Sequence, residues 1–436
     1  MTSATSPPQS RESLVRAIGV AGLAAAIVNI TIGAGIFRLP SSVAASLGTA
    51  APLAYVLCAI AMGLIVYCMA EAGRRVSLTG GPYAYVAVAL GPYAGFICGV
   101  LLWLLGTFAA SAVATVFAAS VGLLVPALGG PVASAAALTV ALLFWVAANI
   151  RGVAIGTRLN SIVTIAKLAP LLLIAVGGVF FVRAENLAWT APAAADVART
   201  CLLLVFAFAG VEVALVPSGE VRDPSRTVPR AIALAMIGVT ILYVLLQVVA
   251  QGILGGQLAH ATASPLADAA GASLGGWARA LLLAGAAIST FGHMGGMALS
   301  MPRMLYAFAR DRFLPRVLAS VDRQTLAPHV AIVTQSLLTL VLALTGSFEK
   351  LAVLANICAL GVYFGCAVAA WRLQATHTVA ASEGASVMTR VVPWLACGVI
   401  LWLLTGVTRD EWLAFGGCIV TASVLYVVAS GRRARA

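Results

Sequence analysis

The residues of this sequence that could do chemistry are charged side chains placed inside long apolar segments. Lys167 lies in NSIVTIAKLAPLLL, and Glu212 lies in VFAFAGVEVALVP. A charged side chain deep in a membrane span is costly and by default indicates function. Lys167 could bind carbonyl groups or exchange a proton, or it could be a lysine that snorkels to the membrane surface. Glu212 could be a proton site or gate, or it could cap exposed backbone amides. The residues alone leave these alternatives open.

Two glycine-containing stretches predict breaks in apolar helices. NITIGAGIFRLP (29–40) has Gly33 and Gly35 within one helix turn, and Gly210 precedes Glu212 and Pro217 in the second stretch. Glycine inside a helix costs about 1 kcal/mol relative to alanine, and lipid adds a penalty for every unpaired backbone group. Glycine can also serve only as a close-packing residue in membrane helices. Because the two stretches form a pair, we expect helix breaks at both.

A broken helix offers two complementary binding groups. Its outer half begins with free N–H groups, which suit a carboxylate, and its inner half ends with free C=O groups, which suit an ammonium. A zwitterionic α-amino acid carries both groups on one carbon. Asn29 could add a side-chain amide near the first break, or it could form an interhelical hydrogen bond.

The elements that position these residues are membrane-spanning helices. The chain has 436 residues, of which 62% are hydrophobic and 9% are charged, and its mean hydropathy is +1.04. Soluble proteins carry about 25% charged residues, so this is an all-α integral membrane protein. Apolar runs of roughly 20 residues each predict about twelve spans. These lie near 17–45, 50–72, 91–125, 131–149, 158–182, 197–219, 229–254, 277–301, 328–346, 349–371, 391–408 and 411–430.

The basic residues predict topology. Most of the 26 lysines and arginines fall in the segments on one side of the predicted spans. The positive-inside rule then predicts that both termini are cytoplasmic in a multi-pass protein of the cell membrane. The net charge of +12 therefore does not indicate a nucleic-acid partner.

Other chemistries lack support in the sequence. The eight cysteines lie in apolar runs without CxxC spacing, so we expect no metal site, cofactor or disulfide framework. The four histidines are scattered, and no nucleophile–base pair marks an enzyme. His293 is expected to lie inside a span, either as a packed, hydrogen-bonded residue or as a proton carrier.

The two predicted breaks suggest internal symmetry. The breaks fall in the first and the sixth predicted spans, five positions apart, so the two broken helices cross the membrane in opposite directions. Paired interruptions of this kind are typical of inverted-repeat transporters. We expect a disordered cytoplasmic tail, two inverted five-helix repeats, and two additional C-terminal helices with a basic tail, at 1–13, 14–182, 183–372 and 373–436 respectively.

Several segments resemble the amino acid–polyamine–organocation transporters, in particular bacterial amino acid permeases and exchangers. NITIGAGIFRLP is similar to that family's first-helix GxGIFxxP signature, and FAFAGVEVALVPSGEVRDPSRTVPRA is similar to its sixth-helix pattern. TGGPYAYV and MPRMLYAFARDRFLP resemble two further family segments. The resemblance implies a LeuT-like 5+5 inverted repeat with helices 1 and 6 broken. It also implies a substrate pocket formed by Ile32, Gly33, Ala34, Gly35, Ile36, Phe206, Ala207, Ala209 and Gly210.

The resemblance further implies a function. Phe206 matches a position where relatives carry an aromatic residue over the bound side chain, and Lys167 matches a lysine that replaces the cation of sodium-coupled relatives. Coupling or gating is therefore expected from Lys167, Glu212 and Asn29. The expected function is secondary transport of amino acids by alternating access, through proton coupling or exchange and without sodium. Transport of polyamines or other small organic amines, and a non-transporting sensor, are the alternatives. Substrate, protons and lipid are the expected partners.

Overall fold

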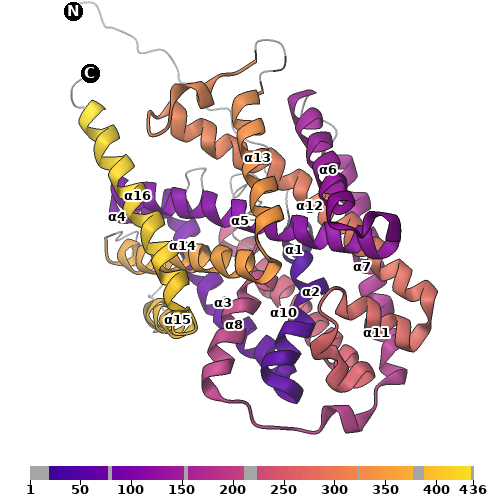
Figure 1. Ribbon diagram of the computed structural model, residues 1–436. Coiled ribbons are helices and arrows are strands. Elements are labelled where there is room, and N and C mark those ends of the chain that lie inside the picture. The colour runs from indigo at the N-terminus through magenta and orange to yellow at the C-terminus, as the bar shows by residue number, and fades with distance from the viewer. Residues whose placement is uncertain are drawn as a thin grey trace, which may run out of the picture.

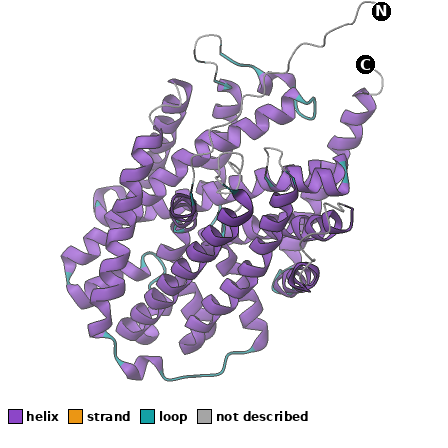
Figure 2. Cartoon of the chain, turned by 180° about the vertical axis from the view of Figure 1, so that it is seen from behind, coloured by secondary structure: helices purple, strands orange, loops and turns teal. Residues whose placement is uncertain are grey.

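The protein is a bundle of long helices that cross one another at varied angles (Figure 1). The computed structural model describes residues 19–76, 81–151, 156–210, 223–322, 325, 327–376 and 387–433. Over these ranges every regular element is a helix, and no strand is present (Figure 2).

Seven helical segments among the described residues are long and apolar enough to cross a membrane, judged by length and composition. One of them runs from α2 (Ala34–Leu47) through η1 (Gly48–Ala50) into α3 (Ala51–Arg75). The other six are α5 (Pro92–Leu124), α6 (Pro131–Arg151), α10 (Pro224–Leu254), α12 (Gly276–Arg310), α14 (Phe348–Thr376) and α16 (Arg409–Arg433). The chain is therefore a multi-pass membrane protein. The count of about twelve spans stays a prediction.

Shorter helices complete the bundle. The shorter apolar ones are α1 (Val20–Thr31), α7 (Gly156–Gly177), α13 (His329–Thr345) and α15 (Val387–Leu404). The others are α4 (Pro82–Leu90), α8 (Ala194–Phe208) and α11 (Pro265–Leu274). Short 3₁₀ segments lie at η2 (Pro126–Leu128), η4 (Gly178–Phe181), η5 (Ala184–Leu187), η7 (Gly255–His260) and η8 (Arg316–Ala319). Proline is the first residue of α4, α5, α10 and α11. An N–H at the first position of a helix would have no carbonyl partner within that helix, so proline, which lacks an N–H, loses no hydrogen bond there.

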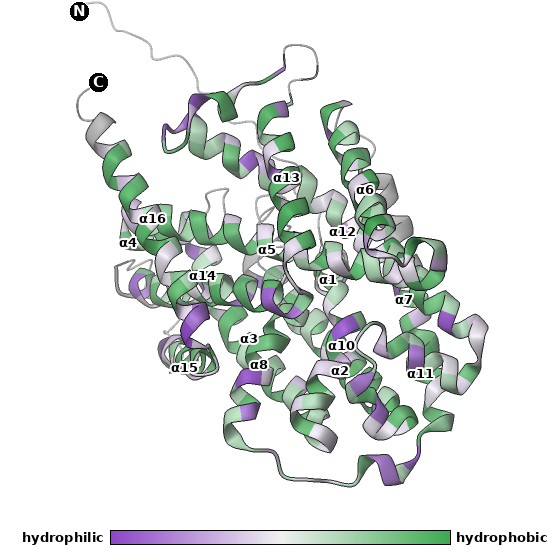
Figure 3. Ribbon diagram, in the orientation of Figure 1, coloured by the Kyte–Doolittle hydropathy of each residue, from purple (hydrophilic) through white to green (hydrophobic). Residues whose placement is uncertain are grey.

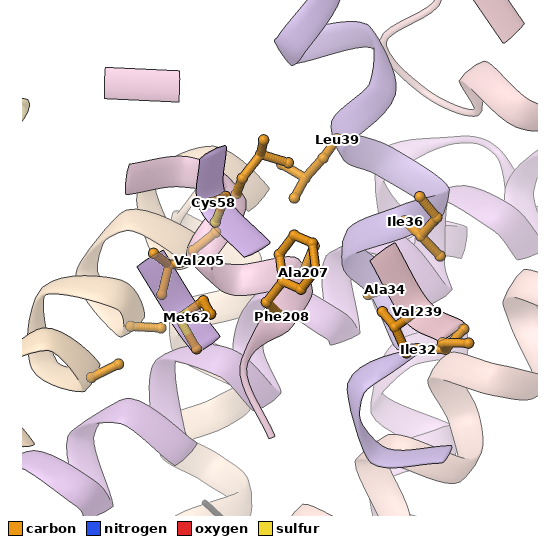
Figure 4. Packing of buried hydrophobic residues seen from close by; sticks show 14 of the residues in the cluster. Ile32, Ala34, Ile36, Leu39, Cys58, Met62, Val205, Ala207, Phe208 and Val239 are labelled. Carbon is orange, nitrogen blue, oxygen red and sulfur yellow. The ribbon is translucent and has the colours of Figure 1, made fainter. Parts of the chain in front are cut away.

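The core lies where α2, α3, α5, α8, α10 and α14 meet. Figure 4 shows part of it, with Leu39 of α2, Met62 of α3, Phe208 of α8 and Val239 of α10, all buried. Helices α6 and α16 are mostly exposed and lie at the periphery. Apolar residues cover most of the length of these outer helices (Figure 3), as expected where side chains face lipid.

The first predicted interruption occurs in the structure, and at the second the described helix ends just before Gly210, while residues 211–222 lie outside the described ranges. Helix α1 ends at Thr31, Ile32 and Gly33 are not helical, and α2 begins at Ala34. Helix α8 ends at Phe208, and Ala209 and Gly210 form a turn. The first interruption is shorter than the expected Gly33–Gly35 break, because Gly35 already lies inside α2.

Candidate functional site

The first interruption and the C-terminal end of α8 meet at one internal cavity. Its volume is about 70 Å³, and four parts of the bundle line it: the α1–α2 break, α5, the C-terminal end of α8, and α12. The lining residues are Ile30, Thr31, Gly33, Ala34, Gly35, Leu102, Leu105, Gly106, Ala109, Val113, Phe206, Ala209, Gly210, His293, Met297 and Met301. Backbone from both breaks and side chains from two intact helices therefore enclose a single site.

Glycine allows the two broken helices to approach each other closely. A Cβ atom added to Gly35 would lie 2.9 Å from the Cα of Ala207, so a side chain cannot fit between α2 and α8 there. Gly210 has φ of +117°, which L side chains rarely adopt, and its Cβ would lie 2.7 Å from the Ile30 side chain. Gly35 is thus a packing residue, whereas Gly33 and Gly210 lie at the interruptions themselves.

Lys167 holds the carbonyl end of the first broken helix. Its side chain is only 5% exposed, and its Nζ donates a hydrogen bond to the carbonyl oxygen of Asn29 in the last turn of α1. A helix ends with partial negative charge, which a buried ammonium stabilises. Lys167 therefore does not snorkel to the surface, and Asn29 contributes its backbone carbonyl to this contact.

Two further side chains hold carbonyl groups of the broken helices. The Tyr243 hydroxyl of α10 lies 3.1 Å from the Thr31 carbonyl oxygen and 3.0 Å from that of Ala207, and it can donate to either. Asn356 of α14 donates from Nδ2 to the Leu202 carbonyl at 2.8 Å. Both residues are fully buried. The Tyr243 contacts reach carbonyl groups at helix ends, which lack intrahelical partners, whereas Asn356 contacts a carbonyl inside α8.

The sequence analysis missed Tyr243 and Asn356. Tyr243 belongs to a stripe on α10 at every fourth residue, continued by Gln247 and Gln251. Gln247 lies 3.4 Å from the Pro40 carbonyl, and Gln251 donates to the Gly48 carbonyl at 2.9 Å. Polar residues four apart in an otherwise apolar span share one helix face, and this spacing was the signal that could have found Tyr243.

We expect Tyr243→Phe to destabilise the protein by about 1–3 kcal/mol, because a buried carbonyl loses its donor. The control is Tyr55→Phe. The Tyr55 ring packs edge-on against Tyr243 at 6.2 Å, but its buried hydroxyl has no hydrogen-bond partner among the described residues. Removing that hydroxyl should leave stability unchanged or raise it. Thermal unfolding of the detergent-solubilised variants measures both effects, and equal midpoints for the two would contradict the role of Tyr243.

An aromatic pair separates the cavity from a second one. Phe206 lines the central cavity, and its ring packs edge-on against Phe348 of α14, with centroids 5.5 Å apart. Phe348 lines a cavity of about 490 Å³ together with Arg38 and Glu349, and exposed residues such as Ser347 also border it. Arg38 Cζ lies 6.0 Å from the Phe348 centroid, and Arg38 Nε lies 3.6 Å from Glu349 Oε1. We call these four side chains the aromatic–ionic layer.

The structure brings together most of the predicted pocket residues. Gly33, Ala34, Gly35, Phe206, Ala209 and Gly210 line the cavity. Ile32, Ile36 and Ala207 do not line it, and their side chains are instead buried in the helix core (Figure 4). Glu212 lies outside the described residues. His293 and Thr31, which the sequence analysis did not assign to the pocket, are part of its lining. Within the described ranges no three His, Cys, Asp or Glu side chains cluster as metal ligands would.

Comparisons with known proteins match this sequence to transporters. Residues 18–428 match the amino acid permease family. A methylthioribose transporter of Bacillus subtilis (strain 168) is 26% identical over 442 residues, covering 96% of this chain and 94% of that protein. The serine/threonine exchanger SteT of the same organism is 28% identical, covering 78% of each chain. Cationic amino acid transporter 2, vacuolar, of Arabidopsis thaliana is 28% identical over 78% of this chain and 56% of its own.

Proposed function

The chain belongs to the amino acid permease family, and from that premise we propose that it carries a small amino acid across the cell membrane by alternating access. The resemblance read from the glycine-containing segments is confirmed, and the relatives are transporters rather than enzymes. The substrate and its coupling are the new parts of the proposal.

The observation that carries the proposal is that the first helix interruption and the C-terminal end of α8 meet at one cavity. The first amides of α2, beginning at Ala34, have no preceding carbonyl within their helix and suit the substrate carboxylate. The carbonyl ends of α1 and of α8 near Phe206–Ala209 suit the ammonium. The backbone would thus bind the part that all α-amino acids share, and the cavity side chains would select among them.

The architecture we propose is about twelve spans with a LeuT-like 5+5 inverted repeat. The repeats cover 14–182 and 183–372, and both termini are cytoplasmic. Spans 1, 2, 6 and 7 would move as a bundle. In this topology the C-terminal half of the first broken helix, α2, leads outward, so the aromatic–ionic layer would close the cavity toward the outside. Opening would then require Phe206 and Phe348 to part and Arg38 to separate from Glu349.

Coupling would depend on Lys167. Its ammonium lies at the carbonyl end of α1, where a bound cation would make the same contact. This supports sodium-independent exchange or proton-coupled transport over sodium symport. Glu212 remains a proposed proton site or gate. Lipid surrounds the protein, and its oligomeric state does not enter the proposal.

Counterflow in proteoliposomes tests the proposal. Vesicles loaded with one unlabelled amino acid at a time are given labelled substrate at two pH values, with and without sodium. We expect saturable accumulation of labelled substrate that does not require sodium. In an exchanger this accumulation ceases when the internal amino acid is omitted, and in a proton-coupled transporter it ceases when the proton gradient is dissipated. Binding of an amino acid without any flux would indicate a sensor, and a strict sodium requirement would contradict the role given to Lys167.

A second candidate function follows from one comparison. The methylthioribose transporter matches 96% of this chain, so a small uncharged sugar derivative is the competing substrate class. Including 5-methylthioribose in the same counterflow panel separates the two. Accumulation of this sugar without accumulation of any amino acid would replace the first proposal by the second.

A further inference from the structure

The central cavity contains two buried polar atoms without partners. His293 Nε2 and Thr31 Oγ1 are both buried, and neither has a hydrogen-bond partner among the described residues. Both residues line the cavity. Buried polar atoms in proteins nearly always have partners. Because these two atoms share one cavity, a single ligand placed there can supply both missing hydrogen bonds.

Thr31 differs from three other threonines inside these helices. Thr107, Thr139 and Thr240 each donate their hydroxyl to the carbonyl four residues earlier. This is the usual arrangement for a threonine in an apolar helix. Thr31, the last residue of α1, makes no such bond. Its carbonyl is within reach of the Tyr243 hydroxyl, which fixes the backbone from which the Thr31 side chain extends.

His293 lies directly beside the first interruption. A Cβ atom added to Gly33 would be 3.9 Å from His293 Nδ1. The imidazole comes from α12, whereas Thr31 comes from α1, so two helices contribute one polar group each. Imidazole and hydroxyl groups can both donate and accept, which matches a ligand hydroxyl with the same dual capacity.

The surroundings restrict the ligand further. The side chains of Leu105, Val113, Met297 and Met301 make the remaining lining largely apolar, and no acidic residue is among the described residues that line the cavity. The volume of about 70 Å³ favours a compact substrate. A neutral, compact, hydrogen-bonding side chain fits these conditions.

We propose that His293 and Thr31 form a polar subsite that binds the hydroxyl of a small substrate side chain. The protein would then prefer hydroxyl-bearing neutral amino acids over apolar ones of the same shape. This inference rests on the proposed transport function and adds the substrate class. An apolar substrate of equal size would leave both polar atoms unpartnered, which a site of this kind disfavours strongly.

Threonine and valine provide the test, because they have the same shape and differ by a hydroxyl in place of a methyl. Initial counterflow rates would be measured for both amino acids in wild type, His293→Leu, His293→Gln and Thr31→Val. The wild type should favour threonine by about 10-fold or more in rate over KM. His293→Leu and Thr31→Val should bring this ratio close to unity while valine transport persists, and His293→Gln should retain part of the preference. Thr139→Val, at a threonine with its own carbonyl partner, should leave the ratio unchanged.

The outcomes separate this inference from the transport proposal. Transport of both amino acids at equal efficiency by the wild type would overturn the polar subsite and leave amino acid transport standing. An unchanged preference in Thr31→Val and His293→Leu would also overturn it. If His293→Leu does not fold, Thr31→Val and His293→Gln still decide, since a preference unaltered in both contradicts the subsite. Absence of all amino acid transport in folded wild type would contradict the proposed function itself.

Discussion

Lys167→Met is expected to abolish counterflow while the protein still folds. The substitution keeps an unbranched side chain of similar length but removes the ammonium that donates to the Asn29 carbonyl. A charge-assisted hydrogen bond contributes about 1.5–3 kcal/mol, which corresponds to roughly a 10- to 150-fold change in an equilibrium constant. If Lys167 also takes part in coupling, the loss of transport will exceed this range. The measurement is the initial rate of counterflow per folded protein, with folding checked by gel filtration and thermal unfolding.

The chain supplies a matched control for this substitution. Lys350 is the other lysine in the sequence, and it lies exposed in the first turn of α14. Lys350→Met removes the same charge by the same chemical change and should leave counterflow unaltered. If both substitutions lowered the counterflow rate equally, the loss would be due to the change in net charge and not to the position of Lys167. If the folded Lys167→Met protein showed wild-type counterflow rates, Lys167 would have no role in transport beyond packing.

Gly35→Ala is expected to give the second large effect. The added methyl would lie 2.9 Å from the Cα and 3.1 Å from the Cβ of Ala207. Backbone cannot rotate away as a flexible side chain can, so α2 must move relative to α8. Overpacking of this kind costs about 1–3 kcal/mol, and here it displaces two walls of the cavity together. We expect substrate affinity to fall by about 10-fold or more, measured as the concentration of substrate that half-saturates counterflow.

Gly238→Ala is the control for this prediction. Gly238 is an exposed residue inside α10, and a Cβ added there would have no atom within 4 Å. Alanine is favoured over glycine in a helix interior by about 1 kcal/mol, so this variant should be as stable as wild type or more so. A Gly35→Ala protein with wild-type affinity would show that α2 and α8 can separate without altering the cavity.

The general character of the protein was predictable from its sequence. Apolar composition and helix-length runs are local properties, and they identified a multi-pass helical membrane protein. The interruption at Gly33 and the end of α8 before Gly210 were also predictable, because glycine within an apolar helix is costly unless the backbone needs it. Lys167 was recognisable for the same reason, since an unpaired ammonium inside a span would be too unfavourable to retain without a partner.

Only the tertiary structure decided whether an individual residue faces the cavity or the helix core. The non-helical residues Ile32 and Gly33 reset the helical phase, so periodicity could not tell that Gly35 lines the cavity whereas Ile36 is buried in the core.

The side chains that contact the carbonyl groups of α1 and α8 also lie far from those carbonyl groups in the sequence. Tyr243 contacts a carbonyl 212 residues away, Lys167 one that is 138 residues away, and Asn356 one that is 154 residues away. A break exposes backbone groups through local sequence, but which side chains satisfy them depends on how whole helices pack. The sequence therefore determined where the helices break, and the packing of α5, α7, α10, α12 and α14 around those breaks determined what the resulting cavity can bind.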